Sequence, residues 1–230
     1  AAGSLFTNLR SGRFQDIGAA VGAVDGGGAI PALAEDLDND GDFDLALAGP
    51  GGVRLRTNEG DGTFADGGVT GPEGVNALAA ADLDNDGWLD LVVSAGSSTG
   101  WWRNLGGLRF ERHGTVADGS VRAVADWNSD GAVDLLLAGA EGARWWLQSE
   151  PANPWLGVAL AGIKSNLRGR GAQVEVKSEG LYQLRTLREG VAHFGLGNAD
   201  EAAVVRITWP NGMIQNALPV PAGAMLGPVA

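Results

Sequence analysis

The stretch from Asp82 to Asp90 reads DLDNDGWLD and is the most informative part of this chain. The same pattern occurs at 36–44 as DLDNDGDFD and, with asparagine in the third position, at 126–134 as DWNSDGAVD. All three copies fit D-x-[DN]-x-D-G-x-x-D and are followed directly by an apolar run. Carboxylates crowded into so short a segment repel one another unless a cation lies among them, so the pattern indicates a metal site.

The metal that the pattern favours is calcium, a hard cation that takes about six to eight oxygen ligands in a flexible geometry. Side chains at alternate positions of a tight loop can face one point, and the glycine after the third ligand permits a sharp reversal. The residue after that glycine offers its carbonyl, and the last aspartate closes the coordination sphere as the chain enters a strand. The expected ligands of about three ions are Asp36, Asp38, Asp40, Asp42 and Asp44, then Asp82, Asp84, Asp86, Trp88 and Asp90, then Asp126, Asn128, Asp130, Ala132 and Asp134, with Asp42, Trp88 and Ala132 binding through the backbone carbonyl.

An EF-hand and an ordinary turn fit the pattern less well than this calcium loop does. An EF-hand loop opens in the same way but requires glutamate at its twelfth position, where this chain has Leu47, Val93 and Leu137. A single Asp-Asn-Gly run is typical of an ordinary turn, whereas three copies with the same ligand positions favour metal binding. Cysteine is absent and there are only two histidines, so the composition disfavours zinc and other soft-metal sites.

The acidic loops belong to a longer repeat. Their first aspartates are separated by 46 and then 44 residues, and an asparagine with a phenylalanine six places later recurs at Asn8, Asn58 and Asn104. Counting from the third loop places the next asparagine at position 148, which is the near-isostere Gln148. Short strand-like runs such as 75–81, 89–94, 100–103 and 108–112 lie between these landmarks. Four short strands in a unit of this length indicate a β-propeller blade.

These units resemble FG-GAP/VCBS repeats, the blades of integrin-type propellers, in which D-x-D-x-D-G-x-x-D is the calcium loop. The resemblance covers residues 1 to about 150 and implies that the aspartates of the three loops are calcium ligands. A closed propeller needs about four to eight blades, so the three blades expected here form a partial array. Other protein chains, or a missing part of the same polypeptide, are the partners expected to complete the propeller.

The repeat stops after Gln148, and the composition changes there. Residues 1–150 carry 23 acidic and 9 basic side chains, whereas residues 151–230 carry 5 and 7. The second segment contains NPWL at 153–156, SNLRGRGAQV at 165–174, HFGLG at 193–197 and VRITWPNG at 205–212. These motifs resemble the ASPIC/UnbV domain of the family of cartilage acidic protein and its bacterial relatives. We therefore expect two domains, 1–150 and 151–230, in an all-β fold: a partial β-propeller-like array of blades followed by a small β-sandwich-like domain.

The function expected from these features is a calcium-binding interaction, adhesion or scaffold module rather than an enzyme. Two histidines, one tyrosine and no cysteine leave few acid–base or nucleophilic groups. Weak calcium modules suit compartments rich in calcium, so we expect an extracellular, periplasmic or cell-surface location. The net charge of −12 argues against a nucleic-acid partner. The sequence contains no apolar run of about eighteen residues, so we expect no insertion into a membrane.

Two alternatives stay open, an accessory part of a secreted hydrolase and a carbohydrate-binding module. The second alternative depends on the tryptophan pairs at 101–102 and 145–146. Neighbouring side chains of a strand face opposite sides, so one tryptophan of each pair is expected in the core while the other packs between blades or stacks on a glycan. We expect a structural role for His193, which lies in a glycine-rich motif, and an exposed position for His113.

Overall fold

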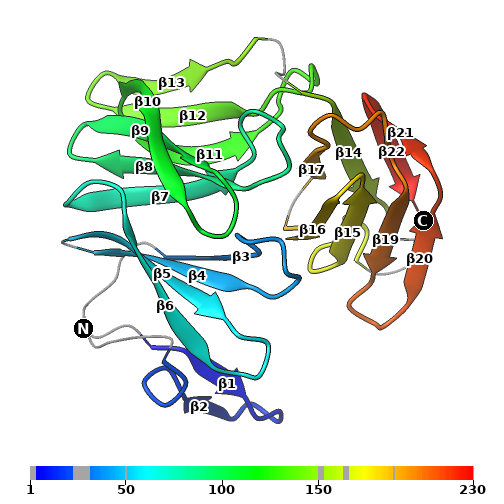
Figure 1. Ribbon diagram of the computed structural model, residues 1–230, viewed down its shortest axis with the longest axis horizontal. Coiled ribbons are helices and arrows are strands. Elements are labelled where there is room, and N and C mark those ends of the chain that lie inside the picture. Colours follow the sequence, from blue (N-terminus) through cyan, green and yellow to red (C-terminus); the bar gives the residue numbers. More distant parts are fainter. Residues whose placement is uncertain are drawn as a thin grey trace.

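The computed structural model describes residues 4–22, 32–49, 51–149, 153–162, 166–188 and 190–229. Every regular element within these ranges is a β-strand, and the strands form small sheets. Figure 1 shows the sheets of the first half side by side as propeller blades, with the sheets of the second half next to them. The predicted all-β, propeller-like fold is therefore confirmed.

The blades are antiparallel sheets in which strands consecutive in the chain are neighbours. The first blade contains β3 (Ala32–Glu35), β4 (Asp44–Gly49), β5 (Gly52–Asn58) and β6 (Phe64–Thr70). The second contains β7 (Val75–Ala81), β8 (Asp90–Ala95), β9 (Ser98–Asn104) and β10 (Phe110–Asp118). The third has three described strands, β11 (Ser120–Ala125), β12 (Asp134–Gly139) and β13 (Gly142–Trp146), and a hairpin of β1 (Phe6–Asn8) and β2 (Phe14–Asp16) precedes all of them.

The asparagine–phenylalanine landmark marks the hairpin between the last two strands of a blade. Its members face each other across that hairpin in the same register, as Asn8–Phe14, Asn58–Phe64 and Asn104–Phe110. The β1–β2 hairpin therefore corresponds to the end of a blade. The strand expected over 108–112 needs a correction, because Leu108 has a φ of 59° in the turn, so that β10 begins at Phe110 and continues to Asp118.

The blades are held face to face by apolar side chains. Consecutive side chains of a strand point to opposite faces of the sheet. In β8, Leu91 and Val93 lie in the core between the first and second blades, whereas Val92 lies in the core between the second and third. All three are at most 1 % exposed. Both faces of the second blade are therefore buried, which requires strands that are apolar at consecutive positions.

The C-terminal domain is built from two main sheets that share one core. One sheet has the order β17 (Val191–Gly195), β14 (Trp155–Leu160), β22 (Ala224–Val229), and the other has β16 (Leu181–Thr186), β15 (Gln173–Ser178), β19 (Val204–Thr208), β20 (Ile214–Ala217). A short pair, β18 (Glu201–Ala202) and β21 (Val220–Pro221), accompanies them. Leu156 and Phe194 from the first sheet pack with Val174 and Ile207 from the second, as in a β-sandwich. The predicted domain boundary at 150/151 lies outside the described residues and stays a prediction.

All three acidic loops occupy the same place in the fold, because each joins the first and second strands of its blade. The loops lie between β3 and β4, between β7 and β8, and between β11 and β12. Strands β3 and β11 both contact β7, so the loops emerge side by side on one rim of the array. The C-terminal domain packs against this rim (Figure 1).

Candidate metal centre

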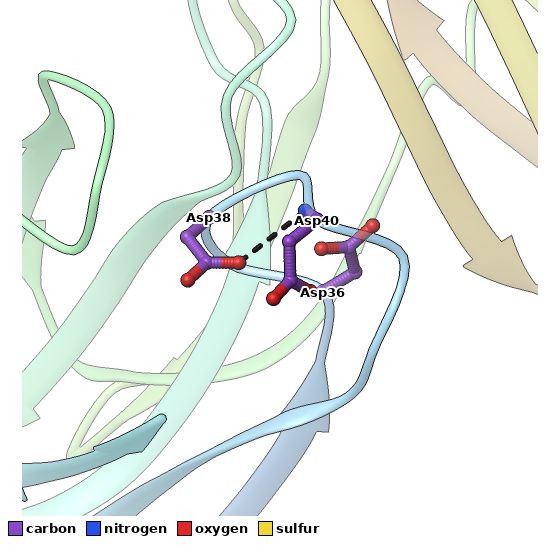
Figure 2. A group of neighbouring side chains, drawn as sticks. All are labelled: Asp36, Asp38 and Asp40. Carbon is purple, nitrogen blue, oxygen red and sulfur yellow. Dashed lines mark hydrogen bonds between the residues drawn. The ribbon is translucent and has the colours of Figure 1, made fainter. Parts of the chain in front are cut away.

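The structure brings the first three aspartates of two loops together. In each loop one oxygen from every member lies within 4.8 Å of the others, and the two groups are Asp36, Asp38, Asp40 and Asp82, Asp84, Asp86. Figure 2 shows the first group on one turn of the chain, where Asp38 Oδ1 accepts a hydrogen bond from the Asp40 amide at 3.3 Å. The convergence predicted from the alternate spacing is therefore present in these two loops.

Two left-handed residues give each loop its tight curvature. The fourth residue has a positive φ in every copy, namely Asn39 at 58°, Asn85 at 56° and Ser129 at 61°. The glycines two places later have φ values of 98°, 94° and 88°, in a region that other residues adopt only at a cost. The chain turns so sharply between these two points that alternate side chains face one centre.

The third loop has the same backbone conformation but one carboxylate fewer. Its Asp130 amide donates to Asp126 Oδ1 at 3.2 Å, and the Gly131 amide donates to Asp126 Oδ2 at 2.9 Å. The matching bonds of the second loop, which end on Asp82, measure 3.1 and 2.8 Å. Asn128 donates from Nδ2 to Asp130 Oδ2 at 2.7 Å, so an amide relieves part of the repulsion that carboxylates cause in the first two loops.

The cost of burial is not fully offset at the first aspartates of the first two loops, Asp36 and Asp82. Asp36 is fully buried, and neither of its oxygens makes a hydrogen bond of good geometry. Burial raises the pKa of Asp36 to about 6, although Arg185 and the Gly41 amide oppose the rise. Burial likewise raises the pKa of Asp82 to about 8. Because an unpaired buried charge is costly, a cation placed among these oxygens would stabilise both loops.

One cationic side chain already lies across the second group. Arg103 Nε is 2.6 Å from Asp84 Oδ2, and its Nη2 is 2.8 Å from Asp86 Oδ2. The first loop has Thr57 at the corresponding place, directly before the landmark Asn58. A metal ion in the second loop would therefore share these two carboxylates with a guanidinium.

The last aspartate of each loop braces the backbone instead of joining a converging group. Asp44 accepts the amide of Leu37 at 3.1 Å through Oδ2 and that of Asn58 at 2.9 Å through Oδ1. Asp90 and Asp134 make the equivalent pairs of bonds in their own blades. The contacts shown are structural, and the expected role of these three residues as ligands stays a prediction.

The residues after the loop glycines are also positioned by backbone contacts. The amides of Asp42, Trp88 and Ala132 each donate to the aspartate two places earlier in the loop, at 2.9, 3.0 and 2.9 Å. Coordination of calcium through the carbonyls of these three residues stays a prediction.

Amide side chains connect each loop to its neighbour. The repeat showed that these residues recur, but not which groups they contact. The fourth residues donate to the glycine carbonyl of the next loop, from Asn39 to Gly87 at 3.0 Å and from Asn85 to Gly131 at 2.8 Å. The landmark amides reach back to the second residue of the preceding loop, from Asn104 to Leu37 at 2.8 Å and from Gln148 to Leu83 at 2.7 Å. The prediction that Gln148 takes the place of asparagine is thus confirmed.

The two tryptophan pairs differ in exposure. Trp102 is 8 % exposed in the core, and Trp101 packs against His113 with ring centroids 4.0 Å apart. In the third blade Trp145 is 57 % exposed and lies edge-on to Trp127, with ring centroids 4.6 Å apart. The exposed aromatic pair is therefore Trp127–Trp145, and the sequence pattern had not included Trp127.

A cleft of about 680 Å³ lies beside the loops, between the blades and the C-terminal sheets. Asp82 and Asp126 line it from the blades, and Trp155, Arg185 and His193 line it from the other side. Burial lowers the pKa of His193 to about 4, so this imidazole is neutral at pH 7. Sequence reasoning did not anticipate Arg185, whose chain context resembles an ordinary strand. Among the described residues, no helix has the length and hydrophobicity needed to cross a membrane.

Comparison with known proteins agrees with the repeat and with the second domain. A family model for the FG-GAP-like repeat matches residues 36–93 and 82–137, and a model for ASPIC and UnbV matches residues 162–227. Comparison with curated proteins finds no match. Among solved structures, a Tc holotoxin pore from Photorhabdus luminescens is similar at 20 % identity over 90 % of this chain, with a TM-score of 0.35, and the chain spans 11 % of that chain's length. The repeat matches over the acidic loops and the domain match over the C-terminal sheets identify the chain as an FG-GAP repeat protein with a C-terminal ASPIC/UnbV domain.

Proposed function

We propose that this protein is a calcium-stabilised interaction module that acts outside the cytoplasm. Ions in the acidic loops hold adjacent blades in one arrangement, and the blade surfaces then bind another protein chain or the rest of a propeller. The observation that carries the proposal is the buried Asp36 carboxylate, which lacks a well-formed hydrogen bond and lies beside two further carboxylates. A divalent cation supplies the missing charge at that point.

The donor atoms favour calcium over other metals. The converging side chains are carboxylates, with one asparagine in the third loop, and oxygen-only sites suit calcium, magnesium or manganese rather than zinc or copper. Carboxylates that converge from one turn match the variable geometry of calcium better than the strict octahedron of magnesium. About three ions follow from three loops of the same backbone conformation.

A calcium titration of the metal-free chain tests this proposal. We expect calorimetry to find about three bound ions and the melting temperature to rise, because a ligand of the native state alone adds about 2.7 kcal/mol when its concentration is 100 times its Kd. Asp36→Asn should remove or weaken one site, whereas Asp118→Asn, at the exposed end of β10, should bind as the parent does. The proposal is wrong if the metal-free chain takes up no calcium at millimolar concentration and its melting temperature does not change.

The environment of both histidines supports a role other than catalysis. His193 Nε2 shares a hydrogen bond with Asn85 Oδ1 at 2.8 Å, and His113 packs on Trp101. Each ring therefore has a packing partner within the chain. We retain the expectation that the protein is not an enzyme as part of this proposal.

The exposed pair Trp127–Trp145 supports a second candidate function, the binding of carbohydrate. Two exposed indoles at an angle present a face on which a sugar ring can stack. On a glycan array, Trp145→Ala should abolish binding while leaving the melting temperature close to that of the parent. Leu147→Ala is the matched control, because Leu147 is equally exposed at 58 % but has no ring. Absence of any glycan signal from the parent chain would dismiss this candidate.

A further inference from the structure

The C-terminal domain covers all three acidic loops at the same point. A Cβ placed on Gly41 would meet Tyr182 at 3.1 Å, and one placed on Gly87 would meet Leu181 at 2.6 Å. At Gly131 an added Cβ would overlap the ring of Trp155. The glycine that lets each loop turn thus also leaves the space into which a side chain of the second domain fits.

The polar contacts between the domains concentrate on the second loop. The Gly195 amide donates to Asp82 Oδ2 at 3.2 Å, and the Gly197 amide donates to the Asn85 carbonyl at 2.9 Å. His193 reaches the side chain of Asn85. Asn153 Nδ2 donates to the carbonyl of Asp84 at 2.7 Å. The second domain therefore holds both a converging carboxylate of this loop and the backbone that shapes it.

Charge complements these contacts at the first and second loops. Arg185 is 7 % exposed, and burial lowers the pKa of its guanidinium, whereas the carboxylates of Asp82, Asp36 and Glu35 oppose that fall. Arg188 makes an ion pair with Glu35 at 2.7 Å, directly before the first loop. The docked domain thus brings one guanidinium, that of Arg185, near Asp36 and Asp82, and a second, that of Arg188, to Glu35 beside the first loop.

We propose that the three acidic loops form the docking surface of the C-terminal domain, and that a cation bound in the second loop and the docked domain stabilise each other. This inference rests on the proposed binding of calcium. Without an ion, no divalent charge draws Asp82, Asp84 and Asp86 to one centre. Asp82 and Asn85, which Gly195, Gly197 and His193 contact, are then held less firmly. The coupling is reciprocal by thermodynamic necessity, so undocking must weaken calcium binding by the same factor.

Residue-resolved hydrogen exchange on the full chain tests the first direction. After calcium removal, verified by elemental analysis, we expect the amides of Gly195 and Gly197 to exchange at least about tenfold faster. The amides of Val174 and Val176 in β15, which lies inside the second sheet of the domain, should keep their rates. Unchanged rates at Gly195 and Gly197, or an equal acceleration in β15 that signals unfolding instead of undocking, would overturn the proposal.

Calcium titration of interface variants tests the reverse direction. His193→Ala should weaken one calcium site by about fivefold or more, the usual lower range for coupled sites. His113 is the exposed histidine of β10, and the control variant His113→Ala should bind calcium as the parent does. Asn153→Ala serves as a second interface variant if His193→Ala does not fold. Calcium affinities that equal the parent's in both interface variants would overturn the coupling. A parent chain that binds no calcium would instead refute the proposed function, so the two failures are distinguishable.

Discussion

The aspartates of the acidic loops are subject to two opposing effects. A carboxylate binds a cation best when it is charged, but burial by the packed blades and domains makes the charged form costly. Burial is the largest influence on these groups, and it raises the pKa of Asp44 to about 7 and that of Asp90 to about 8. The pKa values of Asp36 and Asp82 are raised by burial as well. In the metal-free protein the folded state therefore holds protons on carboxylates that the unfolded chain releases near pH 4.

The stability of the metal-free chain should consequently fall as the pH rises. A raised pKa stabilises the fold fully below the unfolded value of about 4 and loses that contribution as the pH passes through the folded values, here about 6 to 8. Thermal unfolding of metal-free protein at pH 5 and pH 8 should thus give the lower melting temperature at pH 8. Saturating calcium should remove this difference, and a metal-free chain that is more stable at pH 8 would contradict the prediction.

At the scale of elements, the blades are joined by side-chain amides as well as by apolar packing. Asn104 is fully buried and donates to Leu37 in the preceding loop and to Leu89 in its own blade, while its Oδ1 accepts the Gly106 amide. One side chain therefore ties a loop, a strand and a turn together. Loss of such a residue leaves several buried backbone groups without partners, which costs more than the bonds themselves contribute.

Asn104→Ala should lower the free energy of unfolding by at least about 2 kcal/mol, because buried carbonyls lose their donor. Asn58→Ala is the matched control: Asn58 occupies the equivalent position, and its side chain contacts Phe43 and Gly60 of its own blade. Denaturant unfolding should show the smaller loss for Asn58→Ala. Equal losses would mean that the bond between blades contributes nothing beyond the local turn.

At the scale of the whole molecule, the rim formed by the acidic loops is also the surface against which the C-terminal domain packs. The position of Trp155 over Gly131 shows why the loop glycine cannot be judged from the turn alone. Its φ of 88° excludes most side chains on conformational grounds. The neighbouring domain then excludes a Cβ a second time on steric grounds.

Gly131→Ala should therefore destabilise the protein more than the same substitution at Gly107. Both glycines have a positive φ, 88° and 61°, but a Cβ at Gly107 would meet nothing within 4 Å. Gly107→Ala should cost only the conformational penalty, about 1–2 kcal/mol, and Gly131→Ala should add the displacement of Trp155. Melting temperatures of the two variants decide the matter, since equal shifts would show that the domain does not rest on the loop.

Much of the fold and part of the candidate site could be predicted because both depend on local order along the chain. The strand over 75–81 has the predicted bounds, because its apolar run and the acidic loop that follows it are adjacent in the sequence. The convergence of Asp82, Asp84 and Asp86 follows from their spacing. The start of β10 was misplaced because the positive φ of Leu108 is a property of the turn, which residue type alone does not indicate.

By itself the sequence determined the three loops, their repeat and the all-β character of both halves, because ligand spacing and strand periodicity act over a few residues. Only the tertiary structure decided that Asp44 and its counterparts brace backbone amides, and that Gly195 donates to Asp82 across a separation of 113 residues. Whether a polar group is buried, and which partner satisfies it, depends on segments brought together by folding. The spacing of residues along the chain does not indicate which distant residues the fold brings into contact.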